Sequence, residues 1–196
     1  MSLSTRMVVV LTLIAMLSGG ILAGWDAVTK PKIEHHRLMA LKAAIGEVLP
    51  AHDHYDTIEG EGITLYLARP AEGDSLIGIA FQAVGSGFQG EVRVMVGAAP
   101  GFETLTGIKV LEQIETPGLG TKIVEDPSHK SNPLWWPQQF IGVATQPEIV
   151  VIKNAAPSAP NEVQGITGAT ISSQAVARII GADLERARAL YQGQEG

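Results

Sequence analysis

The side chains best suited to chemistry in this chain are hydroxyls in one glycine-bearing stretch, residues 165–173. Apolar residues recur at helical spacing beyond it, which places the stretch where a loop becomes the last helix. The N-terminus of a helix has free backbone N–H groups and a partial positive charge, so it binds phosphate readily. Two hypotheses follow. Either Thr170 holds a phosphate by hydrogen bond or ester, or Thr170, Ser172 or Ser173 caps the helix.

Two further glycine-rich segments are candidates for a binding site, residues 85–90 and 115–120. The first precedes a predicted strand and not a helix, so it is typical of a turn and not of a dinucleotide-binding loop. In the second, Pro117 followed by Gly118 favours a type II turn. This turn is either a plain connection or a surface where glycines let a planar ring approach the main chain beside the hydroxyl of Thr116.

A carboxylate and two indoles adjoin these segments. Glu115 could carry protons, but a solvated carboxylate is the simpler interpretation. Trp135 and Trp136 either pack in the core or serve as an electron bridge or docking surface. No histidine lies in the glycine-rich segments. This absence favours a relay over an enzyme that acts on a free metabolite.

Four histidines fall in two pairs, at residues 35–36 and at 52 and 54. Imidazoles bind several transition metals, so a metal site is one hypothesis. However, residues 52 and 54 would face opposite ways on an extended chain. We therefore expect solvated histidines.

The elements that must position the glycine-rich segments are mostly strands. Short apolar alternations separated by Gly, Asp and Pro turns predict an antiparallel sheet between Ile63 and Lys153. The expected strands lie around residues 63–67, 77–84, 92–96, 108–111 and 149–152. Helices are expected at both ends of this domain, so the predicted fold class is α+β.

The N-terminal part predicts a membrane anchor over residues 1–25. Residues 7–23 are apolar apart from small polar side chains, near the lower limit of about 17 residues for a membrane-spanning helix. Trp25 follows in the place of an interfacial anchor. A cleaved signal peptide is the alternative. Pro31 is expected to end or kink this helix, and an amphipathic connecting helix is expected within 26–50, before a domain over 51–196.

Composition narrows the classes of function. The net charge of −6, without a Lys/Arg cluster, argues against nucleic-acid binding. The chain of 196 residues has no cysteine, which excludes disulfides, cysteine-ligated iron–sulfur clusters, c-type haem attachment and a thiol nucleophile. If the protein moves electrons, the carrier is an organic cofactor or a metal held by nitrogen and oxygen ligands.

The sequence Thr167-Gly168-Ala169-Thr170 resembles the flavinylation motif of FMN-binding domains, in which the last threonine carries FMN through a phosphoester. Gln164 stands where that motif usually has aspartate. The motifs at 85–90, at 115–120 and at 168–170 resemble, in this order, those of the FMN-binding G subunit of Rnf electron-transport complexes. The C subunit of the sodium-translocating NADH:quinone reductase shares much of this pattern.

The resemblance implies a cofactor and its site. FMN would be attached covalently to Thr170 by a flavin transferase that uses FAD, with backbone N–H groups of the helix N-terminus offsetting the phosphate charge. The isoalloxazine would lie against the 115–120 turn, with the 85–90 turn nearby. The implied cofactor-binding residues are Gly87, Phe88, Thr116, Pro117, Gly118, Leu119, Thr167, Gly168, Ala169, Thr170 and Ile171.

The resemblance also implies a setting. The protein would be a single-pass component of a bacterial inner-membrane complex that passes electrons between other membrane subunits, with the FMN domain outside the cytoplasm. The charge bias runs the other way, because Lys30, Lys32 and Arg37 follow the apolar span and only Arg6 precedes it. Three alternatives stay open: the equivalent FMN subunit in a quinone reductase, a flavin-free assembly subunit, and an anchored protein that binds free FMN.

Overall fold

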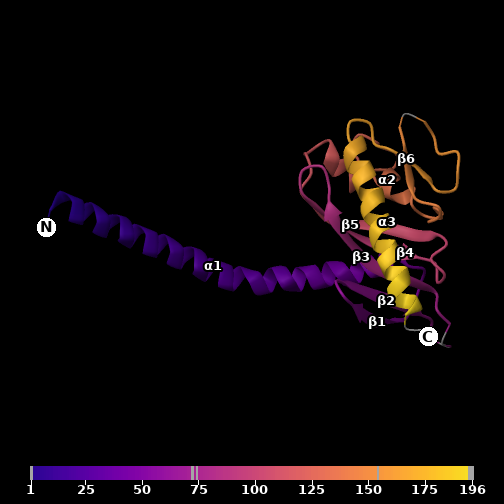
Figure 1. Ribbon diagram of the computed structural model, residues 1–196, viewed down its shortest axis with the longest axis horizontal. Helices are drawn as coiled ribbons and strands as arrows, with labels where there is room; N and C mark the ends of the chain where they lie inside the picture. Colours follow the sequence, from indigo (N-terminus) through magenta and orange to yellow (C-terminus); the bar gives the residue numbers. More distant parts are fainter. Residues whose placement is uncertain (1, 72, 74, 154, 194–196) are drawn as a thin grey trace. The chain divides into compact units, whose positions relative to one another are not determined.

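The computed structural model describes residues 2–71, 73, 75–153 and 155–193. It confirms the predicted α+β class, with an N-terminal helix, an antiparallel sheet and a C-terminal helix (Figure 1). Two compact units are present, residues 1–40 and 41–196. The elements are α1 (Leu3–Val48), β1 (His54–Gly60), β2 (Ile63–Arg69), β3 (Gly78–Ser86), β4 (Glu91–Ala98), β5 (Leu105–Gln113), η1 (Gly120–Ile123), α2 (Trp135–Gln138), β6 (Val150–Ile152), β7 (Glu162–Gln164) and α3 (Thr170–Gln192).

Helix α1 is continuous over Leu3–Val48, with Pro31 inside it. Of the two effects expected of Pro31, ending or kinking the helix, the first is excluded. A proline removes one hydrogen bond and crowds the preceding turn, but the hydrogen bonds of the flanking turns hold the helix on both sides. Within the described residues, α1 is the one helix long and apolar enough to cross a membrane. This agrees with the predicted anchor.

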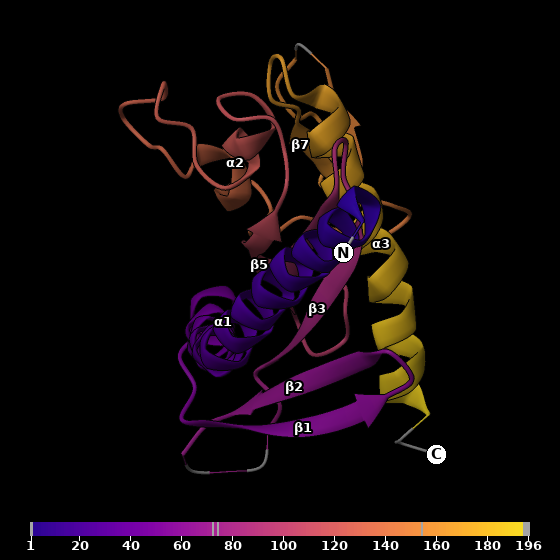
Figure 2. The same ribbon diagram turned by 90° about the vertical axis from the view of Figure 1, so that its left-hand side faces the viewer.

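The five-stranded sheet is an antiparallel meander in the order β1-β2-β3-β4-β5. Figure 2 shows β1 and β2 side by side at one edge. Alternate residues of the strands point to opposite faces. On one face, Leu65, Phe81 and Val94 form the main core with apolar residues of α3, including Val176 and Ile180. Burial of this apolar stripe is what attaches α3 to the sheet.

The other face packs against the last turns of α1, within the second compact unit. Ala44, Ile45 and Val48 are buried there in a cluster with Ala80 and Met95 of the sheet. The approach is close enough that a Cβ on Gly97 would overlap the carbonyl oxygen of Val48. The hydroxyl of Thr106 donates a hydrogen bond of 2.5 Å to that same oxygen. These last turns of α1 fall inside residues 26–50, where the sequence predicts an amphipathic connecting helix.

The remaining elements depart from the sequence-based expectation. The sequence does not predict β1, because this exposed edge strand carries mostly polar residues and lacks an apolar alternation. β6 and β7 form a separate parallel pair and not part of the antiparallel sheet. Residues 114–149 fold mainly as loops around η1 and α2.

Candidate functional site

The N-terminus of α3 lies where the sequence predicts it. The helix begins at Thr170 after Ala169, and Gly168 adopts φ of +83°, a left-handed conformation that glycine tolerates best. Within the described residues, no side chain caps this helix. The capping hypothesis is therefore wrong. The first-turn N–H groups remain available to an anion.

Ser173 has a different role from the expected cap. Its hydroxyl accepts a hydrogen bond from the N–H of Ile166 at 3.1 Å and donates one to the carbonyl of Ala169 at 3.0 Å. These bonds fold the 166–169 loop back onto the buried side of the helix. The buried side chain of Ser173 thus fixes the conformation of the loop that precedes Thr170.

A pocket of about 330 Å³ opens in front of this helix end. Residues from all three predicted segments line it, although they are far apart in the sequence: Phe88, Thr116, Leu119, Gly120, Gly168, Ala169, Thr170, Ile171 and Ser172. Phe88, Leu119 and Ile171 expose 57%, 47% and 58% of their surface, so the pocket has an apolar rim. An apolar slot that ends at an uncapped helix N-terminus suits a flat aromatic ring with a phosphate.

Not every predicted site residue lines this pocket. Pro117, Gly118 and Thr167 lie outside its lining. Gly87 instead lines a larger groove of about 770 Å³ that runs along α3 from Ile171 to Glu185. The charged side chains of Glu148, Glu185 and Arg178 also line that groove, so its charge is mixed. The smaller pocket is the one that includes Gly168, Ala169 and Thr170 at the start of α3.

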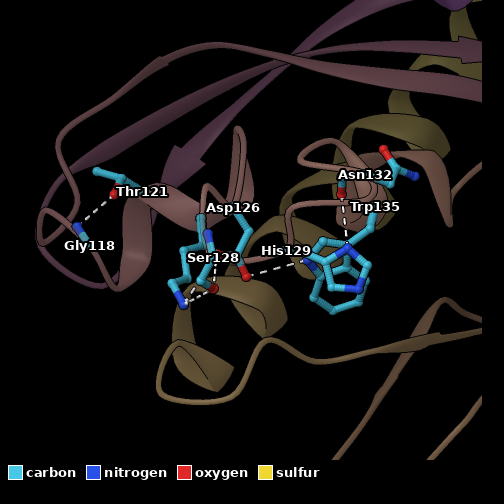
Figure 3. Close-up of polar contacts among 8 residues, drawn as sticks. Gly118, Thr121, Asp126, Ser128, His129, Asn132 and Trp135 are labelled. Carbon is cyan, nitrogen blue, oxygen red and sulfur yellow. Dashed lines mark hydrogen bonds and ion pairs between the residues drawn. The ribbon is translucent and has the colours of Figure 1, made fainter.

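The 115–120 segment forms the expected turn. The N–H of Leu119 donates to the carbonyl of Thr116 at 3.1 Å, and Gly118 has φ of +74°. This is the pattern of a type II turn. The N–H of Gly118 also donates to the hydroxyl of Thr121 at 2.9 Å, so the first residues of η1 hold the turn (Figure 3).

Glu115 is not solvated, which makes the simpler interpretation wrong. Only 6% of its surface is exposed. Its carboxylate accepts hydrogen bonds from the N–H groups of Phe88 and Gln89 and from the hydroxyl of Ser172. Glu115 follows the end of strand β5, and its side chain points inward where three loops meet. Its donors are distant in the sequence and come together only in the folded protein.

Two glycines are required by the space that the side chain of Glu115 occupies. A Cβ on Gly87 would overlap the carboxylate, and a Cβ on Gly120 would lie 2.6 Å from it. These two glycines make room for the side chain of Glu115. The sequence does not predict a place in the site for Glu115 or for Gln89, which donates to the hydroxyl of Thr116. The position of Gln89 inside the 85–90 motif is the sequence feature that could have indicated its place in the site.

Trp136 is fully buried and belongs to the core. Its Nε1 donates to the carbonyl of Gln164 at 2.9 Å, and the side chain of Gln139 bonds both the N–H and the carbonyl of Gln164. The segment 135–140 thus has a structural role: these hydrogen bonds to Gln164 fix the backbone that leads from β7 into the loop before Thr170. Core packing is thus the role of Trp136.

The ring of Trp135 lies beside that of His129, tilted by 35°, and its Nε1 lies 3.4 Å from the carboxylate of Asp126 (Figure 3). Asp126 is 6% exposed and accepts hydrogen bonds from the hydroxyl and N–H of Ser128, with Lys122 at 3.3 Å. The hydrogen bond from Ser128 is the main cause that lowers the pKa of Asp126 to about 2. This cluster ties the loop after η1 to α2.

The histidines show no common site. The Nδ1 of His52 donates a hydrogen bond to the carbonyl of Pro50 at 2.9 Å, and His54 is exposed at the start of β1. Among the described residues, no group of three or more His, Asp or Glu side chains is close enough to hold a metal ion.

Comparison with known proteins identifies the class to which this fold and site belong. The family model described as FMN-binding domain matches residues 87–185. The chain belongs to this family. The G subunit of the Na⁺-translocating ferredoxin:NAD⁺ oxidoreductase complex of Acetobacterium woodii is 41% identical over 92 residues, which are 46% of this chain and 39% of that protein.

Two other relatives extend the comparison. The G subunit of the ion-translocating oxidoreductase complex of Methanosarcina acetivorans is 26% identical over 179 residues, 88% of each chain. The C subunit of the Na⁺-translocating NADH-quinone reductase of Vibrio vulnificus is 35% identical over 118 residues, 57% of this chain and 42% of that protein. The match thus spans less than half of that protein and of the Acetobacterium woodii relative. With the apolar helix α1, these membrane-complex relatives indicate a membrane-anchored protein.

The fold also has solved counterparts. NqrC of Shewanella oneidensis superimposes with a TM-score of 0.56 over 76% of this chain and 73% of that chain, at 18% identity. The C subunit of the Na⁺-translocating NADH-quinone reductase of Parabacteroides distasonis gives a TM-score of 0.51 over 76% and 81%, also at 18% identity. These likenesses support the fold.

Proposed function

We propose that this protein is a membrane-anchored electron carrier with FMN esterified to Thr170, in an ion-translocating oxidoreductase complex of the Rnf type. The observation that carries the proposal is the pocket in front of the uncapped N-terminus of α3, which gathers the three motif segments. Bound FMN supplies electron transfer in one-electron or two-electron steps.

The chain's own residues would bind and orient the cofactor. The hydroxyl of Thr170 would form the ester with the FMN phosphate, and free N–H groups of the first helical turn would offset the charge of that phosphate. In the attachment, the oxygen of Thr170 would bond to the FMN phosphorus of FAD, the pyrophosphate bond would break, and AMP would leave with the hydroxyl proton lost to solvent. A flavin transferase is the expected partner for this step.

The ring would lie between the 115–120 turn and the rim side chains. Thr116 would give one hydrogen bond, while Phe88, Leu119 and Ile171 would exclude water from one side. No titratable side chain lines the described part of this pocket. Such a lining suits a carrier that exchanges electrons with neighbouring subunits, since it offers no acid or base for chemistry on a substrate.

The deciding experiment is denaturation of protein purified from membranes of a host with the flavin transferase. Flavin fluorescence that stays with the denatured band, with a matching increase in intact mass, is the expected result. Flavin released on denaturation would instead indicate an anchored protein that binds free FMN. A colourless protein would indicate a flavin-free assembly subunit.

We also propose that the FMN domain lies outside the cytoplasmic membrane. The chain has no cysteine, so one introduced thiol is a unique label. Ser131→Cys, on an exposed loop of the domain, should react with a membrane-impermeant maleimide in intact cells or spheroplasts. Ser4→Cys, before the apolar span, should react only after lysis. The reverse labelling would place the domain in the cytoplasm, as the charge bias suggests.

A further inference from the structure

The carboxylate of Glu115 joins the three walls of the pocket without lining it. Its Oε1 accepts hydrogen bonds from the N–H of Phe88 at 2.7 Å and of Gln89 at 3.2 Å. Its Oε2 accepts one from the hydroxyl of Ser172 at 2.6 Å. The pocket lining includes Phe88 and Ser172 but not Glu115. Glu115 therefore contacts residues of the pocket wall and does not itself face the pocket.

The carboxylate and its three donors come from three separate parts of the chain. Phe88 and Gln89 lie in the β3–β4 turn, Glu115 follows β5, and Ser172 lies in the first turn of α3. A carboxylate accepts up to four hydrogen bonds, whereas a neutral acceptor of the same size accepts fewer. Charge-assisted hydrogen bonds of this kind are also stronger than neutral ones.

The surroundings are shaped around this carboxylate. Gly87 and Gly120 flank it, and a Cβ on either would clash with its oxygens. Removing the side chain would therefore leave the buried hydroxyl of Ser172 and the partly buried N–H groups of Phe88 and Gln89 without this acceptor. Unsatisfied buried donors are costly, so the three loops would separate to admit water.

We propose that Glu115 is a positioning residue that holds Phe88, the Thr116 turn and the N-terminus of α3 in the arrangement that binds FMN. The identity of the ligand rests on the function proposed above. A proton-carrying role is disfavoured, because both oxygens already accept hydrogen bonds and the residue is walled off from the pocket.

We call this set of hydrogen bonds around Glu115 the brace. Three substitutions at Glu115 distinguish the loss of the brace from a general loss of stability. Glu115→Ala removes every acceptor. Glu115→Asp keeps the charge but is one methylene too short to reach the three donors together. Glu115→Gln removes the charge but preserves the geometry, because its Oε1 can accept from the N–H groups and its Nε2 can donate to Ser172. The matched control is Asp126→Asn, another buried carboxylate, whose hydrogen bonds go to Ser128 and Trp135 and not to the pocket lining.

The experiment uses the full chain in detergent, purified from a host without the flavin transferase. Hydrogen–deuterium exchange of peptides covering 86–91 and 169–174 reports the brace, and titration with FMN reports the pocket. We expect Glu115→Ala and Glu115→Asp to exchange faster in both peptides and to bind FMN about tenfold more weakly. Glu115→Gln should fall between the wild type and Glu115→Ala in both properties, because it keeps an acceptor for the N–H groups but loses the charge. Asp126→Asn should change neither.

Three results would overturn the proposal. Unchanged exchange in Glu115→Ala would show that the carboxylate holds nothing together. Faster exchange with unchanged FMN binding would show a brace without a positioning role. A Glu115→Gln variant as defective as Glu115→Ala would show that charge, and not the geometry of the hydrogen bonds, is what matters. A wild-type chain that binds no FMN would instead overturn the proposed ligand, while the exchange data would still test the brace.

Discussion

The side-chain amide of Gln89 donates a hydrogen bond to the hydroxyl oxygen of Thr116 across 2.7 Å. Because that oxygen accepts from Gln89, the proton of Thr116 is free to point elsewhere, and Thr116 lines the pocket. The pair therefore presents a hydrogen-bond donor to whatever occupies the pocket. A flavin ring offers carbonyl oxygens and ring nitrogens as acceptors for such a donor.

Replacing Thr116 with valine preserves shape and removes the donor. We expect Thr116→Val to retain covalent flavin at Thr170 but to alter the visible spectrum or midpoint potential of the flavin, since about 1 kcal/mol of hydrogen bonding is lost unequally from the two oxidation states. Spectroelectrochemical titration measures this. Thr57→Val, at an exposed position of β1, is the control. An unaltered flavin in Thr116→Val would place the ring elsewhere.

Thr170 is the proposed attachment point, and Ser131 is an exposed hydroxyl on a loop outside the motif. Thr170→Ala should abolish fluorescence on the denatured band, whereas Ser131→Ala should retain it. Because Thr170 makes no capping hydrogen bond, its loss should change the free energy of unfolding by less than about 0.5 kcal/mol. Gel fluorescence and urea denaturation check the two parts, and label retained on Thr170→Ala would move the ester to another residue.

Gly97 and Gly107 are cross-strand partners in β4 and β5 with different surroundings. A Cβ on Gly97 would overlap the carbonyl of Val48, whereas on Gly107 the nearest atoms would be 3.6 Å away. Gly97→Ala should therefore destabilise the domain by about 1–3 kcal/mol, and Gly107→Ala by much less. Chemical denaturation of the full chain in detergent compares them. Equal stabilities would mean that the end of α1 is not seated against β4.

Asp126 predicts a pH dependence. Its pKa in the folded protein, lowered to about 2, lies below the ordinary value of 3.8. A lowered pKa means that its contribution to stability is present above about pH 4 and is lost as the pH falls toward 2. Asp126→Asn should be less stable than the wild type at pH 7, and this gap should close between about pH 4 and 2. Urea midpoints across this pH range measure it; a gap independent of pH would exclude the ionised carboxylate as its source.

Local patterns account for much of what the sequence predicts. The apolar span of α1, the alternation in β2 to β5 and the start of α3 at Thr170 are all encoded within a few neighbouring residues, because helical and strand periodicities are short. β1 and β7 lack such a signal. They are strands because neighbouring segments offer hydrogen-bonding partners, which is a property of the fold.

The same division applies to the site. The sequence by itself determined the three motif segments, the cofactor that they suggest and the residues Phe88, Thr116 and Thr170. Only the tertiary structure decided that Ser172 bonds to Glu115 rather than capping its helix, and that Glu115 is buried. The reason is physical: a carboxylate is a solvated charge or an internal brace according to which donors surround it, and these donors lie 26 and 57 positions away along the chain.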